Sequence, residues 1–83
     1  MFTNKASTGE NNICGKVIAT RRKETGKSQR QLADMLQLAG LDIDKNAIQR
    51  IESGKRFVTD IELVFFAKVF LCTPNDLLFI TEE

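Results

Sequence analysis

The sequence predicts an all-α domain of five short helices, and three observations lead to this fold class. Helix-start residues of the capping type stand at Ser28, Asp44, Thr59 and Thr73. Apolar residues recur at helical spacing after them, and no strand alternation or Asn-Gly hairpin signal competes. With 83 residues, the chain has the size of one small domain. We expect a flexible arm over residues 1–11 and a single domain over residues 12–83.

The expected arm is rich in Thr, Asn, Ser and Gly and carries little apolar surface beyond Phe2. Such a composition favours disorder over packing. A tail that reaches into a DNA groove is the functional alternative, but only the basic residue Lys5 supports it.

The first helix is expected from about Asn12 to Thr25, with Gly26 just beyond its end. The positions that we expect to face the core are Ile13, Val17 and Ile18. The last turns carry a basic cluster of Arg21, Arg22 and Lys23, which favours the helix dipole whether or not DNA is near.

The second helix is expected to begin at Ser28, where Gln31 completes a capping box. Gly40 is the natural stop. The apolar residues between them that recur at helical spacing are Leu32, Ala33, Met35, Leu36 and Ala39.

The third helix is expected to open at Asp44, with Ile43 placed to pack onto Ile48. One side of this helix collects the apolar residues Ala47, Ile48 and Ile51. The other side holds no carboxylate and consists of Lys45, Asn46, Gln49, Arg50 and Ser53. Long donors and amides of this kind pair with guanine and adenine edges in a major groove. Taken alone, the stripe fits a solvated helix face equally well.

The fourth and fifth helices have the same kind of start. Thr59 is followed by Glu62 as a capping box, with Val58 placed to pack onto Leu63. Thr73 caps the fifth helix, and Pro74 takes its first position.

Composition argues against an enzyme, a metal site and a membrane span. The chain has no histidine, and its two cysteines, Cys14 and Cys72, lie far apart, so neither a zinc site nor the commonest general base is expected. We expect both cysteines to be small buried hydrophobes, and we expect no metal, cofactor or small-molecule ligand. No apolar run approaches the length of a membrane span, and the N-terminus lacks a signal-peptide pattern. A cytoplasmic location is therefore expected.

The net charge of +1 hides an uneven distribution. Residues 16–56 carry ten Lys or Arg against five Asp or Glu, a balance of +5, whereas residues 57–83 carry one Lys against five acids, a balance of −4. A basic front and an acidic back suit a protein that faces a polyanion with one side.

An ordered set of residues carries a family resemblance. The run Ser28-Gln29-x-x-Leu32-Ala33-x-x-Leu36, followed by Ile48-x-Arg50-Ile51-Glu52-x-Gly54-Lys55-Arg56, resembles the phage-repressor/Cro-like (XRE) helix-turn-helix family. The resemblance extends to Thr59-x-x-Glu62-Leu63 and Thr73-x-x-Asp76-Leu77-Leu78, so it covers most of the chain. It implies a lambda-repressor-like fold and a transcriptional regulator, expected to be a repressor, that binds double-stranded DNA.

The resemblance and the chemistry of the side chains together assign candidate site residues. The candidates for reading bases are Gln29, Lys45, Asn46, Gln49 and Arg50. The candidates for holding phosphates are Ser28, Ser53, Lys55 and Arg56. In the resembled family, the positions matched by Arg22 and Glu52 form a partly buried salt bridge between the first and third helices, and the same is expected here because Glu52 borders the apolar side of its helix.

The turn departs from the family pattern. Eleven residues, 37–47, separate Leu36 from Ile48, which is more than the family usually has. We expect the surplus to lengthen the second helix by a turn before Gly40, which leaves Leu38 and Leu41 in need of burial. A longer turn changes how the third helix meets DNA.

The fourth helix carries more apolar residues than one stripe can hide. The positions that match the core of the family are Leu63, Phe66, Ala67 and Phe70. The surplus residues are Ile61, Val64, Phe65, Val69 and Leu71, with Phe79 and Ile80 beyond. We expect a homodimer whose interface includes Val64, Phe65, Val69 and Phe79, because exposed apolar patches mark interfaces and two-fold proteins read paired half-sites. The alternative is that Leu38, Leu41 and the lengthened second helix cover part of this surface.

The main rival function is an antitoxin or co-regulator that uses the same fold chiefly to hold a protein partner. The sequence leaves open the operator, the regulated genes, the sign of regulation and the inducing signal.

Overall fold

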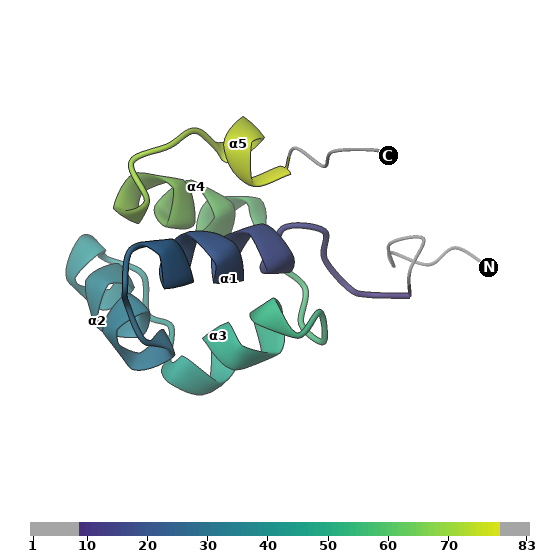
Figure 1. Cartoon of the computed structure of the whole chain (residues 1–83), viewed down its shortest axis with the longest axis horizontal. Helices are drawn as coiled ribbons and strands as arrows, with labels where there is room; N and C mark the ends of the chain where they lie inside the picture. The colour runs from purple at the N-terminus through teal and green to yellow at the C-terminus, as the bar shows by residue number, and fades with distance from the viewer. Residues whose placement is uncertain (1–8, 79–83) are drawn as a thin grey trace.

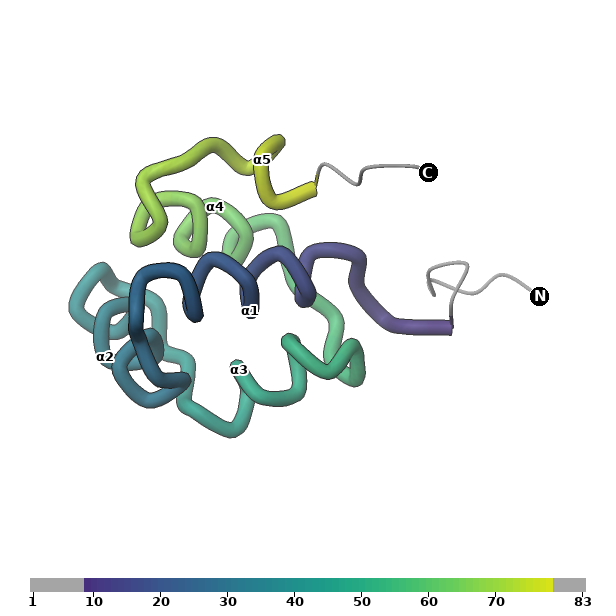
Figure 2. Tube along the Cα trace, in the orientation of Figure 1, coloured from purple at the N-terminus to yellow at the C-terminus, as the bar shows by residue number. Residues whose placement is uncertain are grey.

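The computed structural model describes residues 9–78, and these residues form five helices without a strand. The helices are α1 (Gly15–Glu24), α2 (Gln29–Ala39), α3 (Lys45–Glu52), α4 (Asp60–Val69) and α5 (Pro74–Leu78). Helix α1 crosses the centre, α3 lies on one side of it, α4 and α5 lie on the other, and α2 closes one end (Figure 1). The Cα trace follows the chain from α1 through α2 to α3 and on to α4 and α5 (Figure 2). The all-α fold that the sequence predicts is confirmed.

Side-chain caps fix the starts of α2 to α5. The Ser28 hydroxyl accepts from the Gln31 amide at 3.0 Å while Gln31 accepts from the Ser28 amide at 2.8 Å. Thr59 and Glu62 make the same reciprocal pair. Asp44 accepts from the Ala47 amide at 2.8 Å, and Thr73 pairs with Asp76. All four predicted starts are therefore confirmed.

The predicted start of α1 is wrong by about one turn. The helix begins at Gly15 rather than Asn12, with Cys14 as its N-cap residue. Asn12 lies before the helix, and its side-chain oxygen accepts a hydrogen bond from the Gly15 amide at 2.8 Å. Ile13 precedes the first turn and is 44% exposed, which corrects its expected place in the core. Ile18 is fully buried, and Val17 packs against the core.

The last residue of the expected arm contacts the loop after α3. Most of the expected arm falls outside the described residues. Asn11, its last residue, donates its backbone amide to Gly54 O at 2.8 Å and its side-chain amide to Lys55 O at 3.0 Å. Asn11 is thus part of the folded domain.

The four longer helices end in the same two-bond motif, in which two consecutive residues just beyond the helix donate their backbone amides to carbonyls of its last turn. In α2 the Gly40 and Leu41 amides donate to Gln37 O and Leu36 O, and Gly40 has a φ of 112° that suits glycine alone. In α4 the equivalent position holds Leu71, with a φ of 56°. A leucine in this left-handed conformation costs roughly 1–2 kcal/mol.

One apolar core joins all five helices. Its fully buried members are Ile18, Leu32, Leu36, Ile48, Ile51, Phe66 and Leu77. The Phe66 and Phe70 rings stack with their centroids 6.4 Å apart. Each helix therefore presents one stripe to a common interior, which is what fixes the outward face of α3.

The lengthened turn is built as expected, with one exception. Helix α2 runs on to Ala39, and the Gln37 side chain donates to Ile43 O at 2.7 Å across the turn. Leu41 is half-buried against the core. Leu38, by contrast, is 90% exposed, so the expected burial of this residue does not occur within the monomer.

The surface of α4 divides the surplus apolar residues into two groups. Ile61, Val64 and Leu71 are exposed, by 65%, 47% and 93%. Phe65 and Val69, expected at an interface, pack partly against the domain's own core. The Phe65 ring lies against the end of α2 near Gly40, so the alternative reading holds for this residue. Phe79 and Ile80 lie outside the described residues.

No helix in the described part of the chain has the length and apolar character needed to cross a bilayer.

Candidate nucleic-acid interface

The outer face of α3 presents four polar side chains to solvent, those of Lys45, Asn46, Gln49 and Arg50. Among residues 9–78, none of these side chains makes a hydrogen bond or an ion pair within the protein. The opposite face is anchored by Ile48 and Ile51, both fully buried. The donors and acceptors of the outer face are thus held in place by the core and free to meet a ligand.

An ion pair supports α3 from behind. Arg22 Nε donates to Glu52 Oε2 at 2.7 Å, and Arg22 Nη2 donates to Glu52 Oε1 at 3.0 Å. The side chains are only 12% and 8% exposed. Arg22 also donates to Lys27 O at 2.9 Å. The pair expected from the sequence is therefore present, and it ties the end of α3 to α1.

Gln29 joins this network instead of standing free. Its side-chain amide donates to Glu52 Oε1 at 3.0 Å, and the residue is half-buried. The start of α2 is thereby linked to the end of α3. One N–H of its side-chain amide is engaged by Glu52, so the second N–H and the amide oxygen remain for a base or phosphate.

The loop after α3 contains two basic residues in different surroundings. Lys55 is exposed, and its side chain has no hydrogen bond or ion pair within residues 9–78. Arg56 instead makes a bidentate pair with Glu62, at 3.0 and 2.9 Å. The guanidinium of Arg56 is thus held by a carboxylate that is only 13% exposed, and its phosphate role stays a prediction.

Glu62 owes its charge to these contacts. Burial acts to raise the pKa of its carboxyl, but hydrogen bonds from Arg56 and from the Thr59 amide outweigh burial and hold this pKa below its ordinary value of 4.5. Glu62 therefore stays ionised and joins the Arg56 loop to the first turn of α4.

The two serines expected near phosphate are both exposed, and both have local partners. Ser28 caps α2, and the Ser53 hydroxyl donates to Arg50 O at 3.2 Å. Their hydroxyl oxygens remain at the surface beside α3.

Sequence reasoning missed a basic residue beside α3. Arg30 is exposed on α2 and shares with Lys45 a shallow groove in the lengthened turn, lined by Arg30, Ala33, Asp34, Gln37, Asp44 and Lys45. The sequence contained a signal for this residue, because Arg30 is a basic residue only two positions after the predicted helix start at Ser28.

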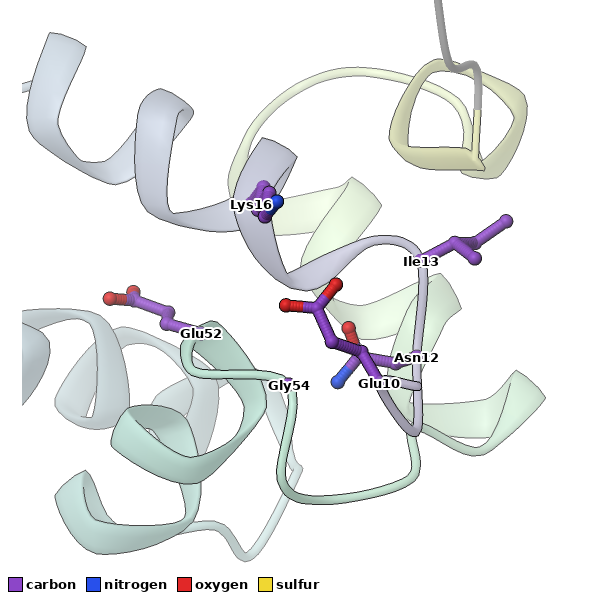
Figure 3. A pocket seen from close by; sticks show the side chains of 6 residues that line it. All are labelled: Glu10, Asn12, Ile13, Lys16, Glu52 and Gly54. Carbon is purple, nitrogen blue, oxygen red and sulfur yellow. The ribbon is translucent and has the colours of Figure 1, made fainter. Parts of the chain in front are cut away.

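A small cavity lies where the chain before α1 meets the end of α3, lined by Glu10, Asn12, Ile13, Lys16, Glu52 and Gly54 (Figure 3). Its volume of about 20 Å³ has room for one water molecule and no larger ligand.

No group of three or more metal-binding side chains gathers within the described residues. Burial raises the pKa of the Cys14 and Cys72 thiols, so both remain protonated near neutral pH.

One comparison with known proteins gives a match. A family model described as helix-turn-helix matches residues 18–77, which run from α1 into α5 and include the lengthened turn. Neither curated proteins nor solved structures give a significant match.

Proposed function

The chain belongs to the XRE-type helix-turn-helix family of DNA-binding transcription regulators, and from this premise we propose that it is a sequence-specific repressor. The operator is read by the outer face of α3. The observation that carries the proposal is the set of four polar side chains without a partner among residues 9–78, on a helix that the fully buried Ile48 and Ile51 anchor.

The chemistry of these side chains assigns their partners. Arg50 and Lys45 suit guanine, whose O6 and N7 accept two hydrogen bonds, while Asn46 and Gln49 suit adenine. Glu52 does not oppose the phosphates, because Arg22 neutralises it.

Phosphate contacts come from the flanks of α3. Lys55 supplies a charge that no partner among residues 9–78 neutralises, and Ser28 supplies a hydroxyl hydrogen. The Ser53 hydroxyl can donate to a phosphate once it turns away from Arg50 O. Such contacts set the register of the protein on the duplex without reading sequence. The balance of +5 in residues 16–56 favours the approach of DNA to this part of the chain.

A selection of bound sites from a random duplex library tests this function. The expected result is an enriched motif whose affinity falls steeply with salt. If no motif is enriched and binding to bulk DNA vanishes at moderate salt, the protein instead uses its fold to hold a protein partner, as an antitoxin or co-regulator does.

We further propose that the repressor acts as a homodimer joined through α4. Ile61 and Val64 share an exposed side of α4, and Leu71 follows at its end. Leu71 carries two free-energy costs in the monomer, because its apolar side chain is exposed and its backbone is left-handed. Burial against a second copy removes the first cost, and a two-fold dimer reads two half-sites about one DNA turn apart.

Sedimentation equilibrium at micromolar concentration tests the dimer. Val64→Glu is the informative variant, because Val64 is 47% exposed, whereas a charge at Phe65 or Val69 also disturbs the monomer core. Thr20→Glu, an exposed position on α1, is the matched control. The parent and the control are expected to be dimers and Val64→Glu a monomer. A monomeric parent contradicts the proposal.

A further inference from the structure

The residues before α1 bind the backbone of the loop after α3. Asn12 Nδ2 donates to Ile51 O at 3.0 Å and to Arg56 O at 2.7 Å. Asn11 donates its backbone amide to Gly54 O and its side chain to Lys55 O, at 2.8 and 3.0 Å. We call Asn11 and Asn12 the clasp. Two adjacent asparagines thus engage four carbonyls across a sequence separation of about forty residues.

Two glycines allow this close approach. Any side chain at Gly15 would collide with the Ile51 carbonyl oxygen and with Asn12 Oδ1. A Cβ at Gly54 would lie 2.8 Å from Glu10 Cγ, and Gly54 also has a φ of 80°. Figure 3 shows Glu10 and Asn12 beside the loop that carries Gly54. The segment before α1 and the loop after α3 therefore pack so closely that neither Gly15 nor Gly54 has room for a side chain.

The loop is fixed on its other side as well. Arg56 is bound to Glu62 at the start of α4, and the Lys55 amide donates to Arg50 O at 2.8 Å. Within this loop the Lys55 side chain alone is both charged and unpaired. A flexible loop would have to be ordered when Lys55 meets a phosphate, at a cost in binding free energy.

We propose that Asn12 is a positioning residue for DNA binding, which holds the loop so that Lys55 meets a phosphate without further ordering. The proposal rests on the proposed function, since Lys55 needs a polyanion to contact. Asn12 touches no DNA in this account and acts through Lys55.

A double-mutant cycle tests the proposal on a short duplex of mixed sequence, titrated with salt. The variants are Asn12→Ala, Lys55→Ala and their combination, with Asn75→Ala on α5 as the matched control. Lys55→Ala is expected to lower the salt slope by about 0.9, as one lost phosphate contact does. Asn12→Ala is expected to weaken binding about three- to tenfold, the cost of ordering one long side chain, and to add nothing once Lys55 is absent. Equal losses in both backgrounds, or an Asn12→Ala protein that binds like the control, would overturn the proposal.

The mobility of the loop provides a readout that needs no DNA. Backbone NMR order parameters of residues 53–56 are expected to fall in Asn12→Ala and to stay unchanged in Asn75→Ala. Asn11→Ala, which keeps the Asn12 contacts and the backbone bond to Gly54 O, serves if Asn12→Ala does not fold; it is expected to loosen residue 55 alone. Unchanged order parameters would refute the role of the clasp. A parent that binds no duplex, with a loop that loosens as expected, would instead count against the proposed function.

Discussion

Helices α3 and α4 both leave side chains exposed, but of opposite kinds. Helix α3 exposes amides and charges, which water solvates at little cost, so the isolated domain loses no stability by presenting them. Helix α4 exposes Ile61 and Val64 and ends at the strained and exposed Leu71. Polar exposure fits the proposed reading surface for DNA, whereas apolar exposure of this extent fits the proposed contact with a second copy.

The two helices also differ in where polar contacts hold them, because the Arg56–Glu62 pair ties the first turn of α4 whereas α3 is tied at its end. Helix α4 buries Phe66 and Ala67 in the core. Helix α3 is short, with eight residues, and depends in addition on polar contacts at its end, from Arg22 and Gln29 to Glu52 and from the clasp to Ile51 O. The position of the reading surface is therefore set by hydrogen bonds as well as by packing.

The largest expected effect comes from removing Glu52. In Glu52→Gln the Arg22 guanidinium, 12% exposed, loses its counter-charge, so unfolding should become easier by ~3–5 kcal/mol. Chemical denaturation measures this, with the exposed Glu24→Gln as control. A variant that unfolds at the denaturant midpoint of the parent would show that α3 does not depend on the ion pair.

A smaller effect is expected from Arg50→Ala, and it concerns binding alone. Losing a bidentate contact to guanine should cost ~1–3 kcal/mol of operator affinity at one base pair. The free energy of unfolding should stay unchanged, because Arg50 has no side-chain partner in the described part of the chain. Titration of matched and base-substituted operators measures the affinity, and chemical denaturation measures the free energy of unfolding. If Arg50→Ala lowers the affinity equally for every sequence, as expected for Lys55→Ala, Arg50 contacts phosphate and does not read a base.

For α4, Leu71→Gly should act in the opposite direction on folding. Glycine relieves the left-handed strain, so the isolated domain should gain about 1 kcal/mol. Self-association should weaken at the same time, because an apolar contact is lost. Thermal melts at low protein concentration and sedimentation at high concentration separate the two effects. A variant that is less stable as a monomer would show that Leu71 packs within its own chain.

The smallest effect concerns pH. The folded-state pKa of Glu62 lies below its unfolded value, so its contribution to stability is complete well above pH 4.5 and is lost as the pH falls through the folded-state pKa. The pKa of Asp76, lowered by the Thr73 amide, acts in the same direction. The free energy of unfolding, measured with urea between neutral and acid pH, should therefore fall less steeply for Glu62→Gln than for the parent. Parallel curves would contradict the role given to the Arg56 pair.

Local chemistry explains what the sequence could predict. A capping box needs residues three apart, so the starts at Ser28 and Thr59 were readable. The same holds for Gly40, whose left-handed turn ends α2. The Arg22–Glu52 pair was accessible only through the family resemblance, because thirty residues separate its members.

What escaped prediction depends on contacts distant in sequence. Nothing near Asn12 indicates that its side chain binds Ile51 O and Arg56 O. Arg56 had a neighbouring carboxylate in Glu62, but the choice of that partner over phosphate depends on how the loop folds back to α4. The partial burial of Phe65 likewise depends on where the end of α2 lies.

The division of labour between α3 and α4 is tested most directly by selecting duplex sites in parallel with the parent, Arg50→Ala and Val64→Glu. The parent should yield two half-sites in two-fold symmetry, about one DNA turn apart. Arg50→Ala should keep this arrangement and lose preference at one base pair in each half-site, whereas Val64→Glu should keep the half-site and lose the pairing. Selected motifs that do not change with Arg50→Ala would contradict the account, since α3 would then not be the surface that reads the sequence.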